Sequence, residues 1–258
     1  MMQLEASEIH LWNVDSEDFD LQSLQAQCLG WLTNVELERY QRYQFDRHRK
    51  QLLLGRMLIR SVLSRYIETI EPASWQFQYN DYGKPSIHKA QQSIPLFFNL
   101  SHSANRLILA VAGFSELGVD IEACLKPRRV ERIADRYFSK QEAKELLSLD
   151  KAEQLSRFYD LWTLKEAYIK ACGLGLAIPL QQFTYSFLDA EKLAIQFDAS
   201  RDDDENRWQL WQLQTAGDYK LALAAKNGER IKQISSWQLK SSSECEPIQA
   251  LVVRSNLD

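Results

Sequence analysis

Each half of the sequence combines one long helical segment with several short strand-like segments, and this arrangement most constrains the fold. The helical period of apolar residues predicts a helix over about 34–67 and a second helix over about 157–172. Because a helix buries one face against a sheet, we expect an α+β protein with two similar lobes, over residues 1–115 and 116–258. The predicted strands are residues 8–15, 75–79, 96–100, 107–112, 117–121, 183–188, 193–197, 208–213, 219–225 and 234–239.

The composition is that of a globular protein with a large apolar core. Hydrophobic residues make up 45% of the 258, and Gly (9) and Pro (6) are few, which excludes a disordered, a collagen-like and a disulfide-stapled chain. The formal net charge of −4 argues against a general nucleic-acid-binding protein. A site for an anion therefore has to be a local basic patch.

The sequence shows neither a membrane span nor an export signal. No apolar run approaches the ~18 residues of a membrane helix, and the segment 1–6 lacks the apolar core of a signal peptide. The cysteines are scattered, without a C-x-x-C pair. We therefore expect a reduced, cytoplasmic protein that binds neither membranes nor nucleic acid.

Two acidic side chains share one face of the predicted strand in the segment Gly-Val-Asp-Ile-Glu. Strand side chains alternate, so Asp120 and Glu122 point to one side while Val119 and Ile121 point to the core. Two close carboxylates repel each other unless a proton or a cation lies between them, and Mg²⁺ is the common hard cation beside phosphates. The alternative is an ordinary polar face of an exposed strand.

The second long helix carries an acid and a base on the face opposite its apolar stripe. Glu166 and Lys170 are four residues apart, so their side chains are neighbours on the helix surface. One interpretation is a surface ion pair. The other makes Glu166 a third carboxylate beside Asp120 and Glu122, and makes Lys170 the charge that stabilises a leaving phosphate.

Side chains suited to phosphate gather in the first half. Lys84 stands in a Gly-Lys-Pro turn, and Ser101 and His102 are expected in a polar loop after a buried strand. Arginine suits bidentate phosphate contacts and lysine supplies a point charge. The alternatives are a solvated basic face or an RNA-binding stripe, which the acidic net charge disfavours. The first helical region is locally basic through Arg39, Arg42, Arg47, Arg49, Lys50, Arg56 and Arg60.

His102 also raises the question of a serine hydrolase, because it stands between Ser101 and Ser103. No G-x-S-x-G elbow occurs in the sequence, and adjacent strand residues point to opposite faces. We do not favour this interpretation. A histidine held by ordinary hydrogen bonds is the simpler alternative.

Together these segments resemble the 4'-phosphopantetheinyl transferases of the surfactin-activator (Sfp) type, over about residues 35–180. The resemblance implies two similar lobes related by a pseudo-twofold axis, with the active site in the cleft between them. It implies Mg²⁺-dependent transfer of the phosphopantetheine arm from coenzyme A to a serine of an apo carrier protein, with 3',5'-ADP as the second product. The matching segments are Arg39, Leu-Leu-Gly-Arg-Met-Leu-Ile-Arg60, Tyr-Gly-Lys-Pro85, Phe-Asn-Leu-Ser-His-Ser103, Gly-Val-Asp-Ile-Glu122, Arg-Tyr-Phe-Ser139 and Trp-Thr-Leu-Lys-Glu-Ala-Tyr-Ile-Lys170.

The resemblance also implies roles for individual residues. Glu166 is expected to be the general base, directly or through water, and Lys170 to stabilise the departing phosphate and contact coenzyme A. The expected Mg²⁺ ligands are Asp120, Glu122 and Glu166, and the expected coenzyme A ligands are Arg39, Lys84, Ser101 and His102. The chemistry agrees with these residue types, because phosphoryl transfer needs positioning and charge neutralisation more than covalent catalysis.

The sequence departs from the family pattern at two positions. Glu36 stands where many members carry a further cation, and Leu52 stands where a small hydroxyl residue often precedes Leu-Leu-Gly. Both departures concern contacts to the nucleotide.

The sequence does not identify the carrier protein that the enzyme modifies, and it leaves two alternative functions open. The acceptor can be an acyl, polyketide or peptidyl carrier protein, and we expect the enzyme to be a monomer. A non-catalytic module that binds coenzyme A or a carrier, and an Mg²⁺-dependent phosphodiesterase that hydrolyses coenzyme A, are the alternatives. Carrier proteins are generally acidic, so a basic patch is expected to attract them, formed by Lys126, Arg128, Arg129, Arg132 and Arg136.

Overall fold

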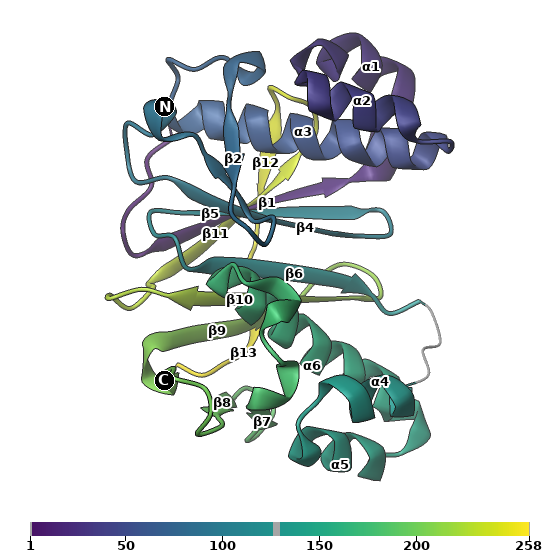
Figure 1. Cartoon of the computed structure of the whole chain (residues 1–258), viewed down its shortest axis with the longest axis vertical. Coiled ribbons are helices and arrows are strands. Elements are labelled where there is room, and N and C mark those ends of the chain that lie inside the picture. Colours follow the sequence, from purple (N-terminus) through teal and green to yellow (C-terminus); the bar gives the residue numbers. More distant parts are fainter. Residues whose placement is uncertain (1, 126–129, 258) are drawn as a thin grey trace.

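The computed structural model describes residues 2–125 and 130–257, and these form two large sheets with helices on either side, together with two small two-stranded sheets (Figure 1). This mixture of helices and sheets confirms the α+β fold class. No helix of the described residues is long and apolar enough to cross a membrane. The helices are α1 (Leu21–Cys28), α2 (Asn34–Arg42), α3 (Asp46–Tyr66), α4 (Val130–Tyr137), α5 (Lys140–Ser148) and α6 (Lys151–Cys172). The strands are β1 (Glu8–Asp15), β2 (Phe77–Tyr79), β3 (Pro85–Ile87), β4 (Phe97–Ser103), β5 (Arg106–Ala112), β6 (Leu117–Ala123), β7 (Phe183–Phe187), β8 (Leu193–Phe197), β9 (Trp208–Leu213), β10 (Tyr219–Lys226), β11 (Gln233–Leu239), β12 (Cys245–Ile248) and β13 (Val252–Ser255).

The last three strands of the chain are divided between the two large sheets, with β11 and β12 in the first and β13 in the second. The first sheet has the order β12-β11-β1-β5-β4, and the second has the order β13-β9-β10-β6. Strand β11 comes from the second half of the sequence but pairs in parallel with β1 of the first half. These pairings cross the position between residues 115 and 116 at which the sequence suggests a division into lobes. That division stays a prediction, because membership of a sheet does not follow it.

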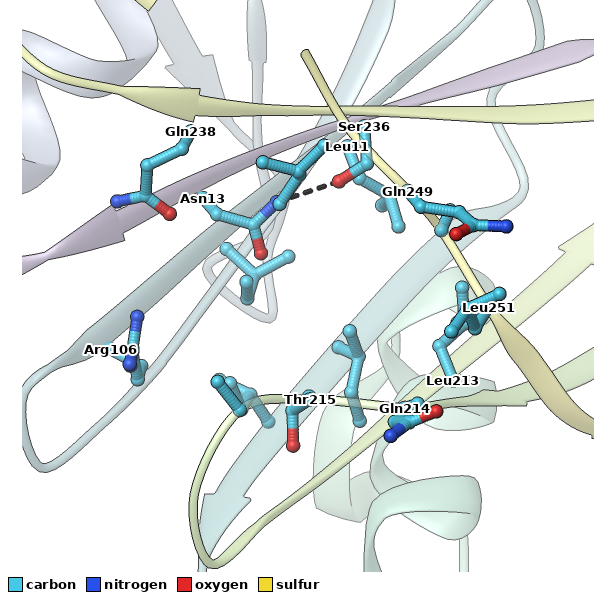
Figure 2. Close-up of a pocket in the computed structure, with 16 residues that line it drawn as sticks. Leu11, Asn13, Arg106, Leu213, Gln214, Thr215, Ser236, Gln238, Gln249 and Leu251 are labelled. Carbon is cyan, nitrogen blue, oxygen red and sulfur yellow. Dashed lines mark hydrogen bonds between the residues drawn. The ribbon is translucent and has the colours of Figure 1, made fainter. Parts of the chain in front are cut away.

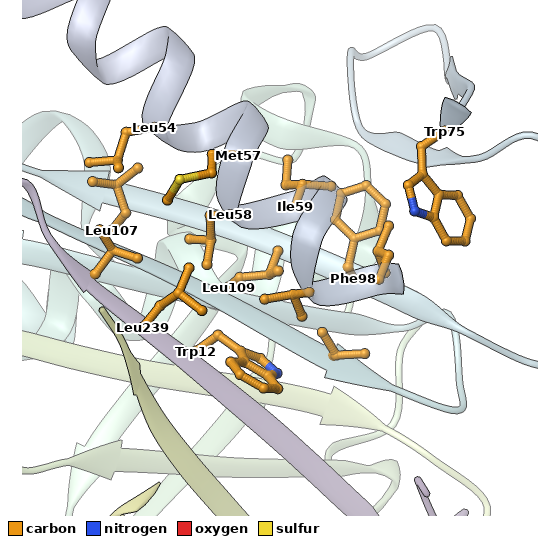
Figure 3. Close-up of a cluster of buried hydrophobic side chains, with 14 of the residues drawn as sticks. Trp12, Leu54, Met57, Leu58, Ile59, Trp75, Phe98, Leu107, Leu109 and Leu239 are labelled. Carbon is orange, nitrogen blue, oxygen red and sulfur yellow. The ribbon is translucent and has the colours of Figure 1, made fainter. Parts of the chain in front are cut away.

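The first hydrophobic core lies between α3 and the first sheet (Figure 3). Leu54, Met57 and Leu58 follow helical spacing and are fully buried. The same cluster contains Trp12 of β1 and Leu239 of β11, so the late strand completes the core of the early helix. Each such side chain contributes roughly 1.5–3 kcal/mol by leaving water.

A second core packs α6 against the second sheet, and a third fills the space between the two sheets. The second includes Phe158 and Leu164 of α6. The third includes Ile108 of β5 and both Val119 and Ile121 of β6. The prediction that Val119 and Ile121 point to the core is therefore confirmed. Helix α6 packs on one side of β6 and the first sheet packs on the other. These contacts fix the position of β6, which carries Asp120 and Glu122.

The structure corrects the prediction of one helix over 34–67, because α2 ends at Arg42 and α3 begins at Asp46. The buried carboxylate of Glu36 on α2 lies 3.3 Å from the Arg60 guanidinium of α3, and 2.5 Å from the Nε atom of Arg56. One straight helix would hold Glu36 and Arg60 about 36 Å apart, at 1.5 Å per residue. The break lets α2 pack beside α3 and form these pairs.

Two further predictions from the sequence need correction. Ser101 and His102 lie in strand β4 and not in a loop, because the strand continues to Ser103 and only the turn at Ala104 and Asn105 separates it from β5. The polar residues of this segment suggested a loop. They occur in a strand because β4 is at the edge of its sheet and has polar side chains on one side. The strand predicted at 75–79 is shorter, since β2 starts at Phe77.

Candidate active site

Gly118 allows helix α6 to lie directly on strand β6. A Cβ atom at this position would collide with the carbonyl oxygen of Ala167 and would lie 2.5 Å from the backbone nitrogen of Ala171. Only glycine permits so close an approach of two backbones. The contact places the half-buried face of α6 that carries Glu166 and Lys170 beside the acidic side of β6.

Lys170 and Asp120 form the central ion pair of the site. The Lys170 Nζ atom lies 2.6 Å from Asp120 Oδ1 and also donates to Ser101 Oγ at 2.9 Å and to the Val119 carbonyl at 3.2 Å. Ser101 in turn donates its hydroxyl proton to Asp120 Oδ1 at 2.9 Å. The site therefore takes its parts from β4, β6 and α6, and the structure brings Asp120, Ser101 and Lys170 together.

The carboxylates of the site influence one another. The pKa of Glu166 is raised to about 7, first by burial and then by the negative charge of Asp120, with Glu122 adding to the effect and Lys170 opposing it. Burial raises the pKa of Asp120 as well, against the Lys170 ammonium and the Ser101 hydroxyl. These couplings place Asp120, Glu122 and Glu166 in one electrostatic cluster. Protons or a cation are needed to keep such a cluster stable.

The cluster is not a preformed metal centre. Among the residues that the structure describes, no three His, Cys, Asp or Glu side chains are arranged to hold a metal ion. The Lys170 ammonium already neutralises one oxygen of Asp120. The other oxygen, Oδ2, is buried and has no hydrogen-bond partner within residues 2–125 and 130–257. An unsatisfied buried carboxylate oxygen is costly unless a ligand completes it.

A second, basic cavity of about 150 Å³ opens where α2 meets α3. His102 faces it, because it points away from Ser101 in the strand, and its Nδ1 accepts a hydrogen bond from the Gln51 amide at 2.7 Å. This bond assigns the remaining proton of a neutral ring to Nε2. Burial, followed by the charge of Lys170, lowers the pKa of His102. The polar lining residues are Arg39, Tyr43, His48, Gln51, Arg56 and His102.

The family departures Glu36 and Leu52 both occur beside this cavity. Glu36 is 7% exposed, and its carboxylate is taken up by Arg56 and Arg60. Leu52 lines the cavity with an apolar side chain. The cavity nevertheless keeps Arg39 and His102 at its wall, so two predicted coenzyme A ligands lie together.

Lys84 lies away from that cavity and links three segments of the chain. Its ammonium donates to the carbonyls of Ser115 at 3.2 Å, Leu117 at 3.3 Å and Ala171 at 2.9 Å, which uses all its protons. Burial lowers its pKa to about 8. Lys84 lines a separate cavity of about 310 Å³ together with Gly173, at the C-terminal end of α6. Its contact with coenzyme A stays a prediction.

Lys165, inside the Trp-Thr-Leu-Lys-Glu segment, does not point to the site. It is fully buried and lies 2.9 Å from Glu142 Oε2, and it donates to the carbonyls of Leu180 and Phe183 at 2.7 Å each. Glu142 also accepts the backbone N–H of Ser139 in the capping box that starts α5. This lysine therefore joins α6 to α5 and to the segment after α6.

We expect Lys165→Met to reduce the free energy of unfolding by about 3–5 kcal/mol, because it leaves the Glu142 carboxylate buried without its cation. Urea unfolding followed by tryptophan fluorescence measures this loss. The double variant Lys165→Met, Glu142→Gln should be more stable than the single lysine variant. A loss below about 1 kcal/mol, the size typical of an exposed pair, would contradict the structural role of Lys165.

The residues proposed to attract an acidic carrier are only partly described. Lys126, Arg128 and Arg129 lie outside the described residues. Arg132 and Arg136 are exposed on α4. A docking role for this set stays a prediction.

Another cavity, of about 340 Å³, lies between the two sheets and away from the acids (Figure 2). Figure 2 shows the amides of Asn13 and Gln214 and the aliphatic side chains of Leu11 and Leu251 around it. Arg106 is the charged residue among its described lining residues. The Arg106 guanidinium is already paired with the Asp15 carboxylate at 3.3 Å, and no acidic side chain stands among the described lining residues. The cavity therefore does not provide a site for both a metal ion and a diphosphate, and the acidic cluster is the stronger candidate.

Two residues of the site were missed in the sequence. Ser103 donates to Glu122 Oε2 at 2.9 Å, and Gln51 holds the ring of His102. The spacing Ser-x-Ser on a strand next to an Asp-x-Glu strand was a usable signal for Ser103, because both patterns have a period of two. Gln51 carried no such signal, since its partner is 51 residues away.

Comparisons with known proteins point in one direction. A family model described as "4'-phosphopantetheinyl transferase superfamily" matches residues 116–224, and one described as "4'-phosphopantetheinyl transferase, N-terminal" matches residues 12–113. The chain is 36% identical over 178 residues to the 4'-phosphopantetheinyl transferase HetI of Nostoc sp., covering 68% of this chain and 73% of that protein. It is 32% identical over 179 residues to a putative 4'-phosphopantetheinyl transferase of Synechocystis sp. (69% and 70% covered). It is 36% identical over 156 residues to the 4'-phosphopantetheinyl transferase Sfp of Bacillus subtilis (60% and 66% covered).

Proposed function

The chain belongs to the 4'-phosphopantetheinyl transferases, and on that premise we propose that it moves the phosphopantetheine arm of coenzyme A to a serine of apo carrier proteins. The single observation that carries this proposal is the joint placement of three acids and Lys170 where β4, β6 and α6 meet. Phosphoryl transfer from a diphosphate needs this combination of positive charge and a proton acceptor.

Mg²⁺ is the cation that we propose for the acidic cluster. The donor set consists of carboxylate oxygens, which hard divalent cations prefer. The buried Oδ2 atom of Asp120 lacks a partner among the described residues, and burial, followed by the negative charge of Asp120, raises the pKa of Glu166. The residues therefore fit such an ion, and Asp120, Glu122 and Glu166 would hold it. When bound, Mg²⁺ supplies a Lewis acid that neutralises the diphosphate.

Glu166 and Lys170 carry out the proton and charge movements in the proposed mechanism. Glu166 accepts the proton of the carrier serine, directly or through water, and its pKa of about 7 suits a base at neutral pH. The serine oxygen forms a bond to the pantetheine-side phosphorus, and the bond from this phosphorus to the bridging oxygen breaks. Lys170, held by Ser101 and the Val119 carbonyl, stabilises the negative charge on the departing 3',5'-ADP.

Coenzyme A is held in this proposal by the positive and neutral donors on and beside β4. Arg39 and the Nε2–H of His102 are available to its phosphates at the cavity between α2 and α3. Ser101 lies on the opposite side of β4, beside Lys170 and the reacting diphosphate. Lys84 is proposed to contact the nucleotide from the far cavity, although its ammonium is used by three carbonyls.

The proposed enzyme acts as a monomer in the cytoplasm. The contacts among Ser101, Asp120 and Lys170 form within a single chain, which is compatible with this proposal. The four cysteines are unpaired thiols, as expected in a reducing compartment.

The test is the intact mass of an apo acyl carrier protein after incubation with this protein, coenzyme A and Mg²⁺. We expect the carrier to gain one phosphopantetheine arm, and expect EDTA to abolish the gain. Peptidyl and polyketide carriers are tested in the same way. Binding of coenzyme A without transfer to any of the three carriers would overturn the proposed activity and leave a binding module.

Activity is expected to rise with pH around the pKa of Glu166. The folded pKa is raised to about 7, so the base is protonated and inactive below that pH and ionised above it. Because Mg²⁺ favours the ionised form, a higher Mg²⁺ concentration should move the midpoint of the profile to lower pH. Initial transfer rates between about pH 5.5 and about pH 8.5 at two Mg²⁺ concentrations measure this shift. Identical profiles at both concentrations would contradict metal ligation by Glu166.

A further inference from the structure

The two sheets meet through side chains rather than through a backbone ladder. Strand β4 is at the edge of the first sheet and β6 is at the edge of the second. Within the described part of the chain, β4 pairs only with β5, and β6 pairs only with β10. The backbone N–H groups on the free side of β6 therefore need acceptors from elsewhere.

Three side chains of β4 provide those acceptors at a spacing of two residues. Asn99 accepts the N–H of Val119 at 2.9 Å, and Ser101 accepts the N–H of Ile121 at 3.2 Å. Ser103 accepts the N–H of Ala123 at 3.0 Å. Because successive donors and acceptors follow the strand period on both sides, β4 and β6 are held in one register.

Each of the two serines also bonds an acidic side chain, and among residues 2–125 and 130–257 no such bond is found for Asn99. Ser101 donates its hydroxyl proton to Asp120 at 2.9 Å, and Ser103 donates its own to Glu122 Oε2 at 2.9 Å. Each serine thus bonds the carboxylate of one β6 residue and the N–H of the next. A carboxylate that accepts such a bond is restricted in the direction of its oxygens.

We infer that Ser103 is a positioning residue that orients the Glu122 carboxylate for the divalent cation. In this inference Ser103 acts through its hydrogen bond to Glu122 and not on the reacting atoms. The inference rests on the proposed function, because it assumes that Glu122 is a ligand of Mg²⁺. Asn99 makes the same kind of bond to β6 without touching an acid, so it provides a matched control for the joining of the sheets.

The experiment titrates Mg²⁺ into the full chain with coenzyme A present and no carrier, and follows binding by calorimetry. We expect Ser103→Ala to weaken Mg²⁺ binding about 10-fold to about 100-fold, the range for losing a hydrogen bond to a metal ligand. Ser103→Thr keeps the hydroxyl and should bind Mg²⁺ as the unaltered protein does. The transfer rate of Ser103→Ala should recover at high Mg²⁺ concentration, which a damaged fold would not do.

The controls separate the possible outcomes. Asn99→Ala should lower the melting temperature while leaving Mg²⁺ affinity nearly unchanged. An equal loss of Mg²⁺ affinity in Asn99→Ala and Ser103→Ala would overturn the inference, because the common effect would be the joining of the sheets. Unchanged affinity in Ser103→Ala together with lost binding in Glu122→Gln would overturn it too, and would leave the proposed function intact. Unchanged affinity in Glu122→Gln would remove Glu122 from the proposed metal site itself.

Discussion

Lys170→Ala is expected to reduce phosphopantetheine transfer by about 10²-fold to about 10³-fold, the usual effect of removing a group that stabilises charge in a transition state. The variant loses the cation that lies 2.6 Å from Asp120 and that Ser101 and the Val119 carbonyl hold in place. The initial rate of carrier modification, followed by intact mass, measures the loss. Circular dichroism and the melting temperature check that the protein remains folded.

A lysine of the same helix provides the matched control. Lys151 is the first residue of α6, far along the helix from Lys170. Its side chain is 77% exposed and pairs with Glu131 of α4. Lys151→Ala should transfer at the rate of the unaltered protein. Asp120→Asn and Glu166→Gln should show losses like that of Lys170→Ala, because they remove the other charges of the cluster. Unaltered rates in any of these three site variants would refute the role assigned to that residue.

Gly118→Ala is expected to have the largest effect on stability among the Gly→Ala substitutions in this chain. The new Cβ would meet the backbone of Ala167 and Ala171, which cannot turn aside as the end of a flexible side chain can. Helix α6 would have to move away from β6, with a cost of about 1–3 kcal/mol or more for overpacking. Transfer should fall as well, because Lys170 and Glu166 would leave their places beside Asp120.

Gly30→Ala is the control for Gly118→Ala. A Cβ at Gly30 would have no atom within 4 Å, apart from its neighbours in the chain. Urea unfolding and the transfer rate should therefore remain close to those of the unaltered protein. A Gly118→Ala protein with unaltered stability and rate would show that the close contact between α6 and β6 is not needed for the site.

The local part of the site could be predicted because it depends on periods within single elements. Asp120 and Glu122 share a side of β6 through the strand period, and Glu166 and Lys170 share a face of α6 through the helical period. Those periods do not state which segments meet. The periods therefore predicted two separate pairs, Asp120 with Glu122 and Glu166 with Lys170. That the two pairs lie next to each other followed only from the resemblance to a family or from the structure.

The parts that could not be predicted involve partners far apart in the chain. The predicted first helix is interrupted between Arg42 and Asp46, although no proline or glycine lies there. This interruption allows Glu36 to pair with Arg60. Lys165 had no predicted role, and the structure buries it in the core beside Glu142. Lys84 looked like a phosphate ligand and is used by three carbonyls in the structure.

The sequence by itself determined many of the elements, the sides to which the site residues of β6 and α6 point, and the presence of residue types suited to phosphoryl transfer. These depend on backbone periods and side-chain chemistry, which are local properties. Only the tertiary structure decided that β11 joins β1, that Ser101 and Ser103 lie on an edge strand, and that this edge faces β6. The physical reason is that unpaired N–H groups on one strand can be satisfied by any suitable acceptor. Packing of the whole chain selects which acceptor lies there.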